Sequence, residues 1–364
     1  MTMLHRLFDE QGQSPWLDNL TRGHLTDGEL ERLIRQGIRG VTSNPTIFAK
    51  AISGSNHYDD QFRRLSDGGV TVTDAYWTMV VDDIKEALVL LREVYNESGG
   101  GDGFVSVELA PDLAHDAVGS VNAARELHDR IDEPNLFVKI PATPEGIPAI
   151  RRMVGEGRNI NVTLIFSLER YEEVIEAYLA GLEVHHGDLS SVHGVASFFV
   201  SRVDTEIDRR LDAIGTDEAQ AWRGKAAVAQ ARLAYRLFQR AFSGPRWEGL
   251  KARGAQPQRP LWASTSTKDP AYSDTLYVDQ LIGPDTINTM PESTIAMFED
   301  HGSIARTIDG GVAEAEQVLE HLKALGVDMV DVGRTLEQEG VTTFEKSFSE
   351  LLESLGSKQR DLVS

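Results

Sequence analysis

The chain carries an apolar run with one charged residue, Leu136-Phe137-Val138-Lys139-Ile140-Pro141, whose composition predicts a central β-strand. In such a strand the Lys139 side chain has only the protein interior to enter. Burial favours the neutral form of a lysine amine, and the neutral amine is the nucleophile that forms a Schiff base with a ketone. The structural alternative is an amine that snorkels, or that pairs with a carboxylate at the strand end.

Seven more short apolar or β-branched runs accompany this one, and helical patterns follow most of them. The eight predicted strands lie near Pro15–Asn19, Gly40–Ser43, Phe104–Leu109, Leu136–Ile140, Ile160–Phe166, Gly194–Val200, Pro260–Ser264 and Thr286–Met290. Eight strands that alternate with helices predict an α/β fold, a (β/α)8 TIM barrel with extra helices and loop insertions. We assign residues 1–364 to a single barrel domain. A doubly wound open sheet is the competing architecture.

Local signals help to place the connecting segments. Thr26 and Glu29 have the spacing of a capping box, and Ser167 is a predicted helix N-cap. Residues 56–96 are predicted to form additional helices between the second and third strands. Residues 184–193 and 243–259 are rich in Gly, His and Pro, which is typical of surface insertions.

Composition excludes several classes of function. The 364 residues contain no cysteine, so disulfides and thiolate chemistry are excluded. A net charge of −21 disfavours binding to nucleic acid or to an anionic membrane. No apolar stretch approaches the roughly 20 residues of a membrane span, and residues 1–10 lack the features of a signal peptide, so we predict a cytoplasmic protein.

Two further motifs point away from metals and nucleotides. His185-His186 lacks the spacing of a helical metal motif, and we expect no metal and no cofactor. The glycine-rich residues 98–103 precede a strand and lack the phosphate-loop pattern, which predicts a flexible connector. Oligomeric state is left open between monomer and homodimer.

Polar side chains gather at the ends of the predicted strands, where the active sites of barrels are built. If they converge, two carboxylates could move protons during cleavage of a carbon–carbon bond while Lys139 accepts electrons through its iminium. Taken singly, each has a structural alternative as a cap, a turn residue or a hydrogen-bonding group. The residues besides Lys139 are Asp18, Asn44, Glu108, Asn161, Thr163, Ser197, Arg202 and Lys268.

Across nearly its whole length the sequence resembles the transaldolases, especially the longer bacterial type. The resemblance rests on four segments in the same order. They are Gly40-Val41-Thr42-Ser43-Asn44-Pro45-Thr46-Ile47-Phe48, Val138-Lys139-Ile140-Pro141-Ala142-Thr143-Pro144-Glu145-Gly146-Ile147, Asn159-Ile160-Asn161-Val162-Thr163-Leu164-Ile165-Phe166-Ser167 and Trp262-Ala263-Ser264-Thr265-Ser266-Thr267-Lys268.

The resemblance implies a class I aldolase-like barrel of the pentose phosphate pathway. Its reaction transfers a dihydroxyacetone unit from sedoheptulose 7-phosphate to glyceraldehyde 3-phosphate, and yields erythrose 4-phosphate and fructose 6-phosphate. By the same resemblance, Lys139 forms the Schiff base, Asp18 takes the hydroxyl proton, and Glu108 and Thr163 hold a catalytic water.

The resemblance also implies substrate-binding roles for five residues. Asn44, Asn161 and Ser197 would position the dihydroxyacetone hydroxyls, and Arg202 would bind the substrate phosphate. Lys268 is a hypothetical second phosphate contact, because shorter members of the family carry an arginine near this segment.

Two other functions compete with transfer. A fructose 6-phosphate aldolase resembles the same barrel and releases free dihydroxyacetone, but it has different polar residues at the positions of Glu108 and Phe199 and is shorter. A noncatalytic sugar-phosphate-binding barrel is the other alternative, since a fold alone does not prove an activity. A fusion with a second catalytic domain is disfavoured, because the sequence ends soon after the helical pattern of residues 344–355.

Overall fold

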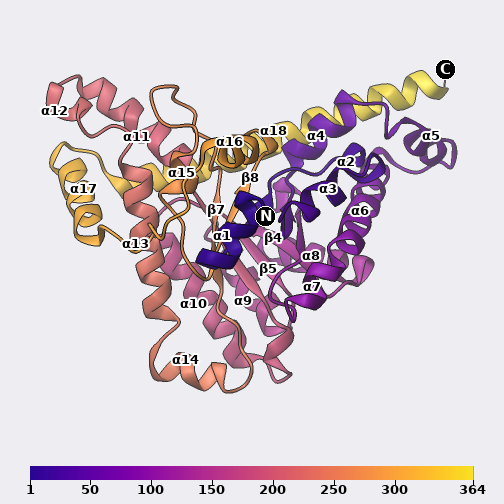
Figure 1. Cartoon of the computed structure of the whole chain (residues 1–364). Coiled ribbons are helices and arrows are strands. Elements are labelled where there is room, and N and C mark those ends of the chain that lie inside the picture. Colours follow the sequence, from indigo (N-terminus) through magenta and orange to yellow (C-terminus); the bar gives the residue numbers. More distant parts are fainter. Residues whose placement is uncertain (364) are drawn as a thin grey trace.

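Eight parallel strands close into a barrel in sequence order, and β1 pairs with β8 to complete the ring (Figure 1). This computed structural model describes residues 1–363, and the side chains of residues 1–360. The strands are β1 (Gln13–Leu17), β2 (Gly40–Thr42), β3 (Phe104–Glu108), β4 (Leu136–Pro141), β5 (Ile160–Ile165), β6 (Gly194–Phe199), β7 (Arg259–Ala263) and β8 (Thr286–Met290). The predicted TIM barrel is confirmed.

Seven of the eight strands lie within one residue of their predicted ends, and β8 matches at both ends. The exception is β1, which starts and ends two residues earlier than predicted. The strand starts at Gln13 and so includes two polar residues that an apolar pattern does not predict. Gln13 and Ser14 are nevertheless buried, and each is hydrogen-bonded to a neighbouring segment. Buried polar side chains with partners are compatible with a strand interior.

Helices surround the barrel and extend it at both ends (Figure 1). Before β5 they are α1 (Met3–Gln11), α2 (Arg22–Thr26), α3 (Glu29–Arg35), α4 (Pro45–Gly54), α5 (Asp59–Asp67), α6 (Val72–Leu90), α7 (Arg92–Glu97), α8 (Ala117–Ile131) and α9 (Gly146–Gly155). After β5 they are α10 (Leu168–Val184), α11 (Ser201–Ile214), α12 (Asp217–Gln220), α13 (Ala226–Ala241), α14 (Gly244–Lys251), α15 (Leu276–Asp279), α16 (Glu292–His301), α17 (Val312–Ala324) and α18 (Met329–Val363).

The predicted helix signals had mixed outcomes. Ser167 caps α10 by accepting the amide N–H of Arg170 at 3.1 Å, as predicted. The predicted capping box is wrong: Thr26 is the last residue of α2 and donates to the carbonyl of Arg22, while Gly28 precedes α3. Because Thr26 belongs to the short helix α2, it cannot also cap α3.

Side chains that point into the barrel form layers of different chemistry. Near the amino ends of the strands Trp16, Phe104 and Phe137 pack together, with ring centroids 4.3–6.4 Å apart. Gly40 is required beside them, because a Cβ there would lie 2.3 Å from the Trp16 indole. Since inward residues recur every second position, Glu108 of β3 and Lys139 of β4 share this direction, as does Asp18 just after β1. An aromatic layer therefore separates the two ends of the lumen.

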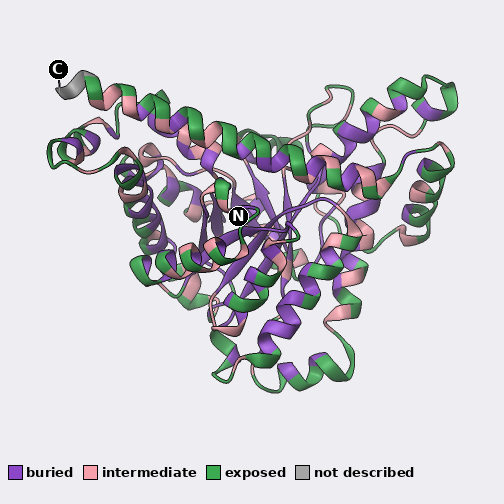
Figure 2. Cartoon of the chain, turned by 180° about the vertical axis from the view of Figure 1, so that it is seen from behind, coloured by how far each residue is buried: buried purple, intermediate pink, exposed green. Residues whose placement is uncertain are grey.

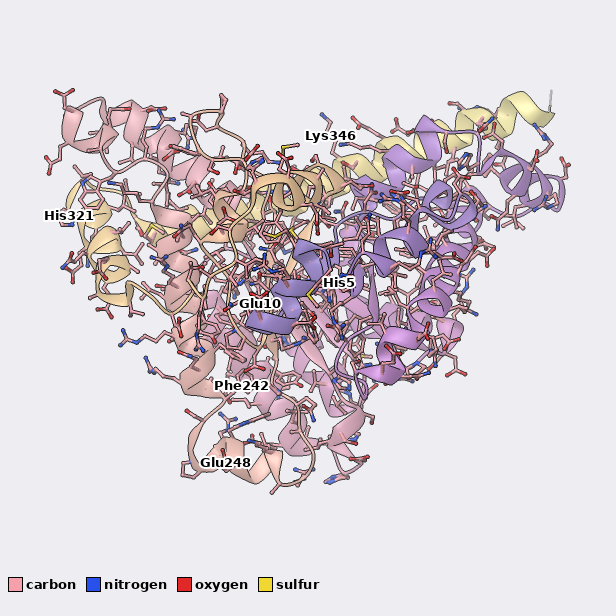
Figure 3. The ribbon with its side chains drawn as sticks, viewed as in Figure 1. His5, Glu10, Phe242, Glu248, His321 and Lys346 are labelled. Carbon is pink, nitrogen blue, oxygen red and sulfur yellow. The ribbon has the colours of Figure 1, made fainter. Side chains whose placement is uncertain are left out.

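The long helix α18 lies across the carboxyl-end mouth of the barrel (Figures 1 and 2). Two glycines permit its close approach. A Cβ at Gly340 would lie 3.0 Å from the Leu164 side chain, and one at Gly333 would lie 2.8 Å from Ser167. Figure 2 shows that α18 buries one face and exposes the other. Lys346 of α18 and Glu248 of α14 mark opposite ends of the molecule in Figure 3.

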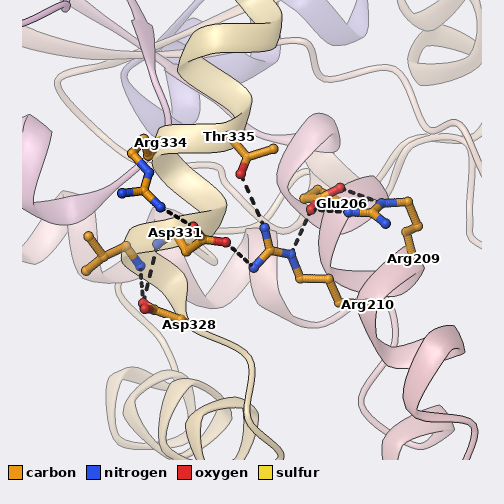
Figure 4. A network of polar contacts seen from close by, with 8 residues as sticks. Glu206, Arg209, Arg210, Asp328, Asp331, Arg334 and Thr335 are labelled. Atoms are coloured by element: carbon orange, nitrogen blue, oxygen red, sulfur yellow. Dashed lines mark hydrogen bonds and ion pairs between the residues drawn. The ribbon is translucent and has the colours of Figure 1, made fainter.

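An ionic network joins the start of α18 to α11 (Figure 4). Arg210 donates to Glu206 at 2.7 Å on its own helix and pairs with Asp331 of α18 at 2.9 Å. Arg210 also donates to the Thr335 hydroxyl at 3.4 Å. Lys358 pairs with Asp59 of α5 near the other end of the helix. The helix over the mouth is thus held at two distant points.

None of the described helices is both long enough and apolar enough to cross a membrane.

Candidate active site

A cavity of about 330 Å³ lies at the carboxyl ends of the strands, under α18. We call it the upper cavity. Asp18 follows β1, Asn44 follows β2, and Lys139 reaches it from β4. Polar groups from strands far apart in the sequence meet here because parallel strands end at one edge. Its other walls include Thr42, Thr46, Ile47, Lys50, Thr163, Ser197, Phe199, Arg202, Ala263, Ser264, Ser266, Lys268, Thr289, Pro291, Thr343 and Phe344.

Lys139 lines this cavity and forms a buried ion pair with Glu108, which does not itself line it. The two residues are Cα partners on β4 and β3, and each side chain is 6% exposed. The Lys139 amine donates to Glu108 Oε2 at 2.7 Å and to the Ser43 carbonyl at 3.1 Å. The carboxylate pairing that the sequence left open as a structural alternative is present. Because the same amine lines the cavity, pairing and catalysis are compatible rather than exclusive.

Asp18 carries the carboxylate that lines the cavity, and its side chain is only partly buried. The Thr42 hydroxyl donates to Asp18 Oδ1 at 2.8 Å, and the Thr42 and Thr289 hydroxyl oxygens lie 2.7 Å apart. Among the described residues Thr42 is the single hydrogen-bond donor to this carboxylate. A carboxylate with so few donors is poorly compensated for the loss of water.

Both carboxyl groups are protonated more readily than ordinary ones. Burial raises the pKa of Asp18, and the nearby Lys139 cation partly opposes this shift. Burial also raises the pKa of Glu108, again against the attraction of Lys139. Raised carboxyl pKa values in a cavity are typical of groups that exchange protons during a reaction.

Thr163 presents an uncompensated hydroxyl to the upper cavity. Its Oγ1 is buried and has no hydrogen-bond partner among the described side chains and backbone groups. The next residue, Leu164, has a left-handed φ of 59°, at an irregularity in the pairing of β5 with β6. Such irregularities re-aim side chains near active sites. The hydroxyl is free to bond a substrate group or a water.

The two amide residues predicted to bind substrate occupy different positions. Asn44 lines the upper cavity and caps α4 by accepting the amide N–H of Ile47 at 2.9 Å. Asn161 does not line the cavity; its amide donates to Ser106 at 3.0 Å and accepts from Ser197 at 2.7 Å. Ser197 does line it. Asn161 therefore orients the Ser197 hydroxyl, which lines the cavity in its place.

Three cationic side chains line the outer part of the cavity. They are Arg202 in the first turn of α11, Lys268 after β7, and Lys50 of α4. None of the three belongs to an ion pair within residues 1–360. Burial lowers the pKa of Lys268, as does the neighbouring Arg202 cation. Uncompensated cations that repel one another form a site suited to phosphate, in a chain whose net charge is −21.

Comparison with known proteins shows the family to which this chain belongs. A model of the transaldolase/fructose-6-phosphate aldolase family matches residues 15–355. The chain belongs to this family.

Full-length transaldolases are among its relatives. Transaldolase 1 of Streptomyces avermitilis is 50% identical over 98% of this chain and 96% of its own length. The transaldolase of Acidothermus cellulolyticus is 53% identical over 93% of this chain and 92% of its own length. That of Frankia alni is 51% identical over 95% of both chains. The family and the transaldolase class that the sequence predicted are confirmed.

The transaldolase-family site also contains residues that sequence reasoning did not select. Thr42 and Thr289 orient Asp18, and Thr343 and Phe344 of α18 close one wall. Thr42 could have been found from its inward position on β2, two residues before Asn44. The α18 residues have no local signal, because a helix distant in sequence brings them to the cavity. Lys50 lies on α4, directly after β2, but no pattern in the sequence marks it.

Proposed function

We propose that this chain catalyses reversible transfer of a dihydroxyacetone unit from sedoheptulose 7-phosphate to glyceraldehyde 3-phosphate, with erythrose 4-phosphate and fructose 6-phosphate as products. The observation that carries the proposal is the Lys139–Glu108 pair, buried beneath an outer wall of three unpaired cations. A reactive amine inside and a phosphate site outside match a phosphorylated ketose that enters with its ketone first.

The first step joins Lys139 to the donor ketone. Glu108, whose pKa burial raises, takes the amine proton across the 2.7 Å hydrogen bond, and the neutral amine attacks the carbonyl carbon. A carbon–nitrogen bond forms, and the carbonyl oxygen leaves as water after protonation. Glu108 and the uncompensated Thr163 hydroxyl hold the water that relays these protons.

The second step breaks the bond between the α and β carbons of the iminium. Asp18 takes the proton of the hydroxyl on the β carbon, which becomes the carbonyl carbon of the departing aldehyde. The electrons of the broken bond move into the iminium and leave an enamine on Lys139. The acceptor aldehyde then enters, and the same steps in reverse form the new ketose and release it by hydrolysis.

The remaining cavity residues hold the substrate. Asn44 and Ser197 contact the hydroxyls of the three-carbon unit, and Asn161 positions Ser197 through its 2.7 Å hydrogen bond. Arg202 binds the phosphate, and Lys268 is a second phosphate contact. The guanidinium of Arg202 lies 5.2 Å from the centre of the Phe199 ring, which limits its freedom and aims it at the cavity.

Release of free dihydroxyacetone, the fructose 6-phosphate aldolase reaction, is the alternative within the same family. Phe199 and Glu108 favour transfer: Phe199 is 7% exposed and packs on Phe166, which keeps that side of the cavity apolar. An apolar wall shields the enamine from the water that would protonate and release it. Fast production of dihydroxyacetone without an acceptor aldehyde would favour the aldolase. Binding of substrates without turnover or a covalent adduct would favour a noncatalytic barrel.

The proposed setting is the cytoplasm, where the chain acts on free sugar phosphates as a monomer or homodimer in the pentose phosphate pathway. It needs no metal or cofactor, since Lys139 supplies the electron sink. It uses neither nucleic acid nor a membrane as a partner.

The test is borohydride reduction in the presence of fructose 6-phosphate, followed by peptide mass analysis. We expect one adduct, on Lys139, with the mass of a reduced dihydroxyacetone unit. Lys50, which lines the same cavity, is the internal control and should stay unmodified. Turnover without any adduct would refute the Schiff-base mechanism.

A further inference from the structure

A second cavity, of about 560 Å³, lies at the amino ends of the strands, on the other side of the aromatic layer from Lys139. We call it the lower cavity. Its walls are residues that precede or begin strands, such as Arg39 before β2, His193 before β6 and Arg259 at the start of β7. Its volume is in the range of small-molecule sites. The catalytic residues proposed above are absent from its walls.

The glycine-rich residues 98–103 connect α7 to β3, as predicted, and form part of this wall. Asp102 is buried, and it accepts hydrogen bonds from Ser14, from the Trp16 indole at 2.9 Å and from Arg39 at 2.9 Å. The carboxylate anchors the segment to the barrel. Arg39 is doubly held, because its guanidinium also lies 3.6 Å from the centre of the Phe8 ring.

Arg259 is the cation of this cavity that lacks a matching acceptor. Its nearest carboxylate oxygen is Asp102 Oδ1 at 3.7 Å, beyond hydrogen-bond distance, and that carboxylate already has three donors. Among the described residues no acceptor is hydrogen-bonded to the Arg259 guanidinium, although the side chain is only 18% exposed. A guanidinium has five N–H donors, so that of Arg259 has donors available for an acceptor that enters the cavity.

The surroundings of Arg259 define what could meet it. The aromatic layer supplies an apolar wall through Phe104 and Phe137. His193 packs against Phe104, with ring centres 5.2 Å apart, and burial lowers its pKa to about 4, so its ring is neutral at physiological pH. The exposed carboxylates of Glu97 and Asp285 also line the lower cavity and would repel a second negative charge.

We propose that the lower cavity binds a small organic monoanion, a single carboxylate on a flat apolar body, with its carboxylate on Arg259. A carboxylate matches the planar guanidinium fork in two parallel hydrogen bonds. The apolar body lies against Phe104, and His193 offers one ring N–H. A phosphate dianion fits less well, because one uncommitted cation faces it together with the two carboxylates.

The test uses benzoate as the probe and isothermal titration of the full chain. We expect saturable binding to one site, and Arg259→Gln should weaken it by about tenfold to a hundredfold, the effect of losing a charged hydrogen-bond pair. Arg35→Gln is the matched control, because Arg35 is 69% exposed on α3. Benzylamine, with the charge reversed, should not bind.

Further measurements separate this site from the upper cavity. Benzoate binding should persist in Arg202→Gln, and Arg259→Gln should keep wild-type turnover, since Arg259 lies at the other end of the barrel. If Arg259→Gln does not fold, Gln256→Trp blocks the cavity from its exposed wall, with Gln256→Ala as its control. Unchanged benzoate affinity in the blocked or Arg259 variants, or its loss in Arg202→Gln, would overturn the proposal. So would absence of binding at millimolar benzoate, or Arg259-dependent binding of inorganic phosphate that is tighter than that of benzoate.

Discussion

Each end of the barrel holds a carboxylate near a cation, but Asp102 is buried and well bonded, whereas Asp18 is partly buried and has few hydrogen-bond donors. At the amino end Asp102 receives hydrogen bonds from a hydroxyl, an indole and a guanidinium. At the carboxyl end Asp18 receives one, from Thr42, and burial raises its pKa. A fully compensated carboxylate fastens a loop, whereas an under-compensated one can change its protonation state. The number of hydrogen-bond donors, rather than burial alone, distinguishes Asp102, which has a structural role, from Asp18, for which we propose proton transfer.

The largest effect should come from removing the proposed nucleophile, Lys139, at the carboxyl end of the barrel. Lys139→Ala should lower kcat by about 10⁴-fold or more, because no other described amine reaches the base of the upper cavity. Steady-state transfer assays with fructose 6-phosphate measure the loss. Circular dichroism should show an intact fold, since Glu108 can become neutral when its partner is gone. Substantial residual turnover would move the chemistry away from Lys139.

A second test addresses the under-compensated carboxylate. Asp18→Asn should lower kcat by about 10²- to 10⁴-fold, the usual contribution of a general base. Thr42 can still donate to the amide oxygen, so the geometry should survive. Borohydride should still trap donor on Lys139 in this variant. Loss of trapping together with turnover would instead assign Asp18 to Schiff-base formation.

The cations of the upper cavity should separate binding from chemistry. Arg202→Gln should raise KM for fructose 6-phosphate by about 10- to 100-fold, the effect of losing a charged hydrogen-bond pair. Lys268→Ala should raise it less, because Lys268 is the more exposed of the two contacts. Neither variant should alter KM for a nonphosphorylated acceptor. Equal effects on both substrates would exclude phosphate contact.

At the amino end the expected change is in stability, not turnover. Asp102→Asn should lower the free energy of unfolding by about 2–4 kcal/mol, because Arg39 loses its buried partner and the loop its anchor. Urea unfolding measures the change, with Asp60→Asn as control on an exposed pair whose loss costs about 0.5 kcal/mol or less. A large fall in kcat of Asp102→Asn would mean that the two ends are coupled.

The smallest effect concerns pH. The proposed mechanism requires ionised Asp18, whose pKa is raised, so kcat/KM should fall with decreasing pH at higher pH values than an ordinary carboxyl predicts. The free energy of unfolding should depend on pH in the opposite direction. Because the pKa of Glu108 is raised, this group contributes stability at low pH, and that contribution is lost as the pH rises through its pKa in the folded protein. Asp102→Asn should leave the acid limb of the pH–rate profile unmoved. A shift in that variant would remove the distinction between the two carboxylates.

Much of the site could be predicted because strand ends carry it. Lys139, Glu108 and Asp18 stand out as polar residues in or just after apolar runs, and the barrel's parallel ends bring them together. The capping box at Thr26 was wrong because a short preceding helix took up that residue. Residues 98–103 have a flexible composition, but contacts of Asp102 with two other segments determine their structure.

The sequence by itself determined the eight-strand rhythm, the family and the candidate nucleophile, since these depend on local periodicity and on residue types that recur in one order. Tertiary structure alone decided which side chains share a space. Contacts between distant segments decide the number of donors on Asp18, the hydrogen bonds of Asn161, the position of Phe344 at the mouth and the spare donors of Arg259. Hydrogen bonding and burial are set by those contacts, and so, in turn, are the charge states on which the chemistry depends.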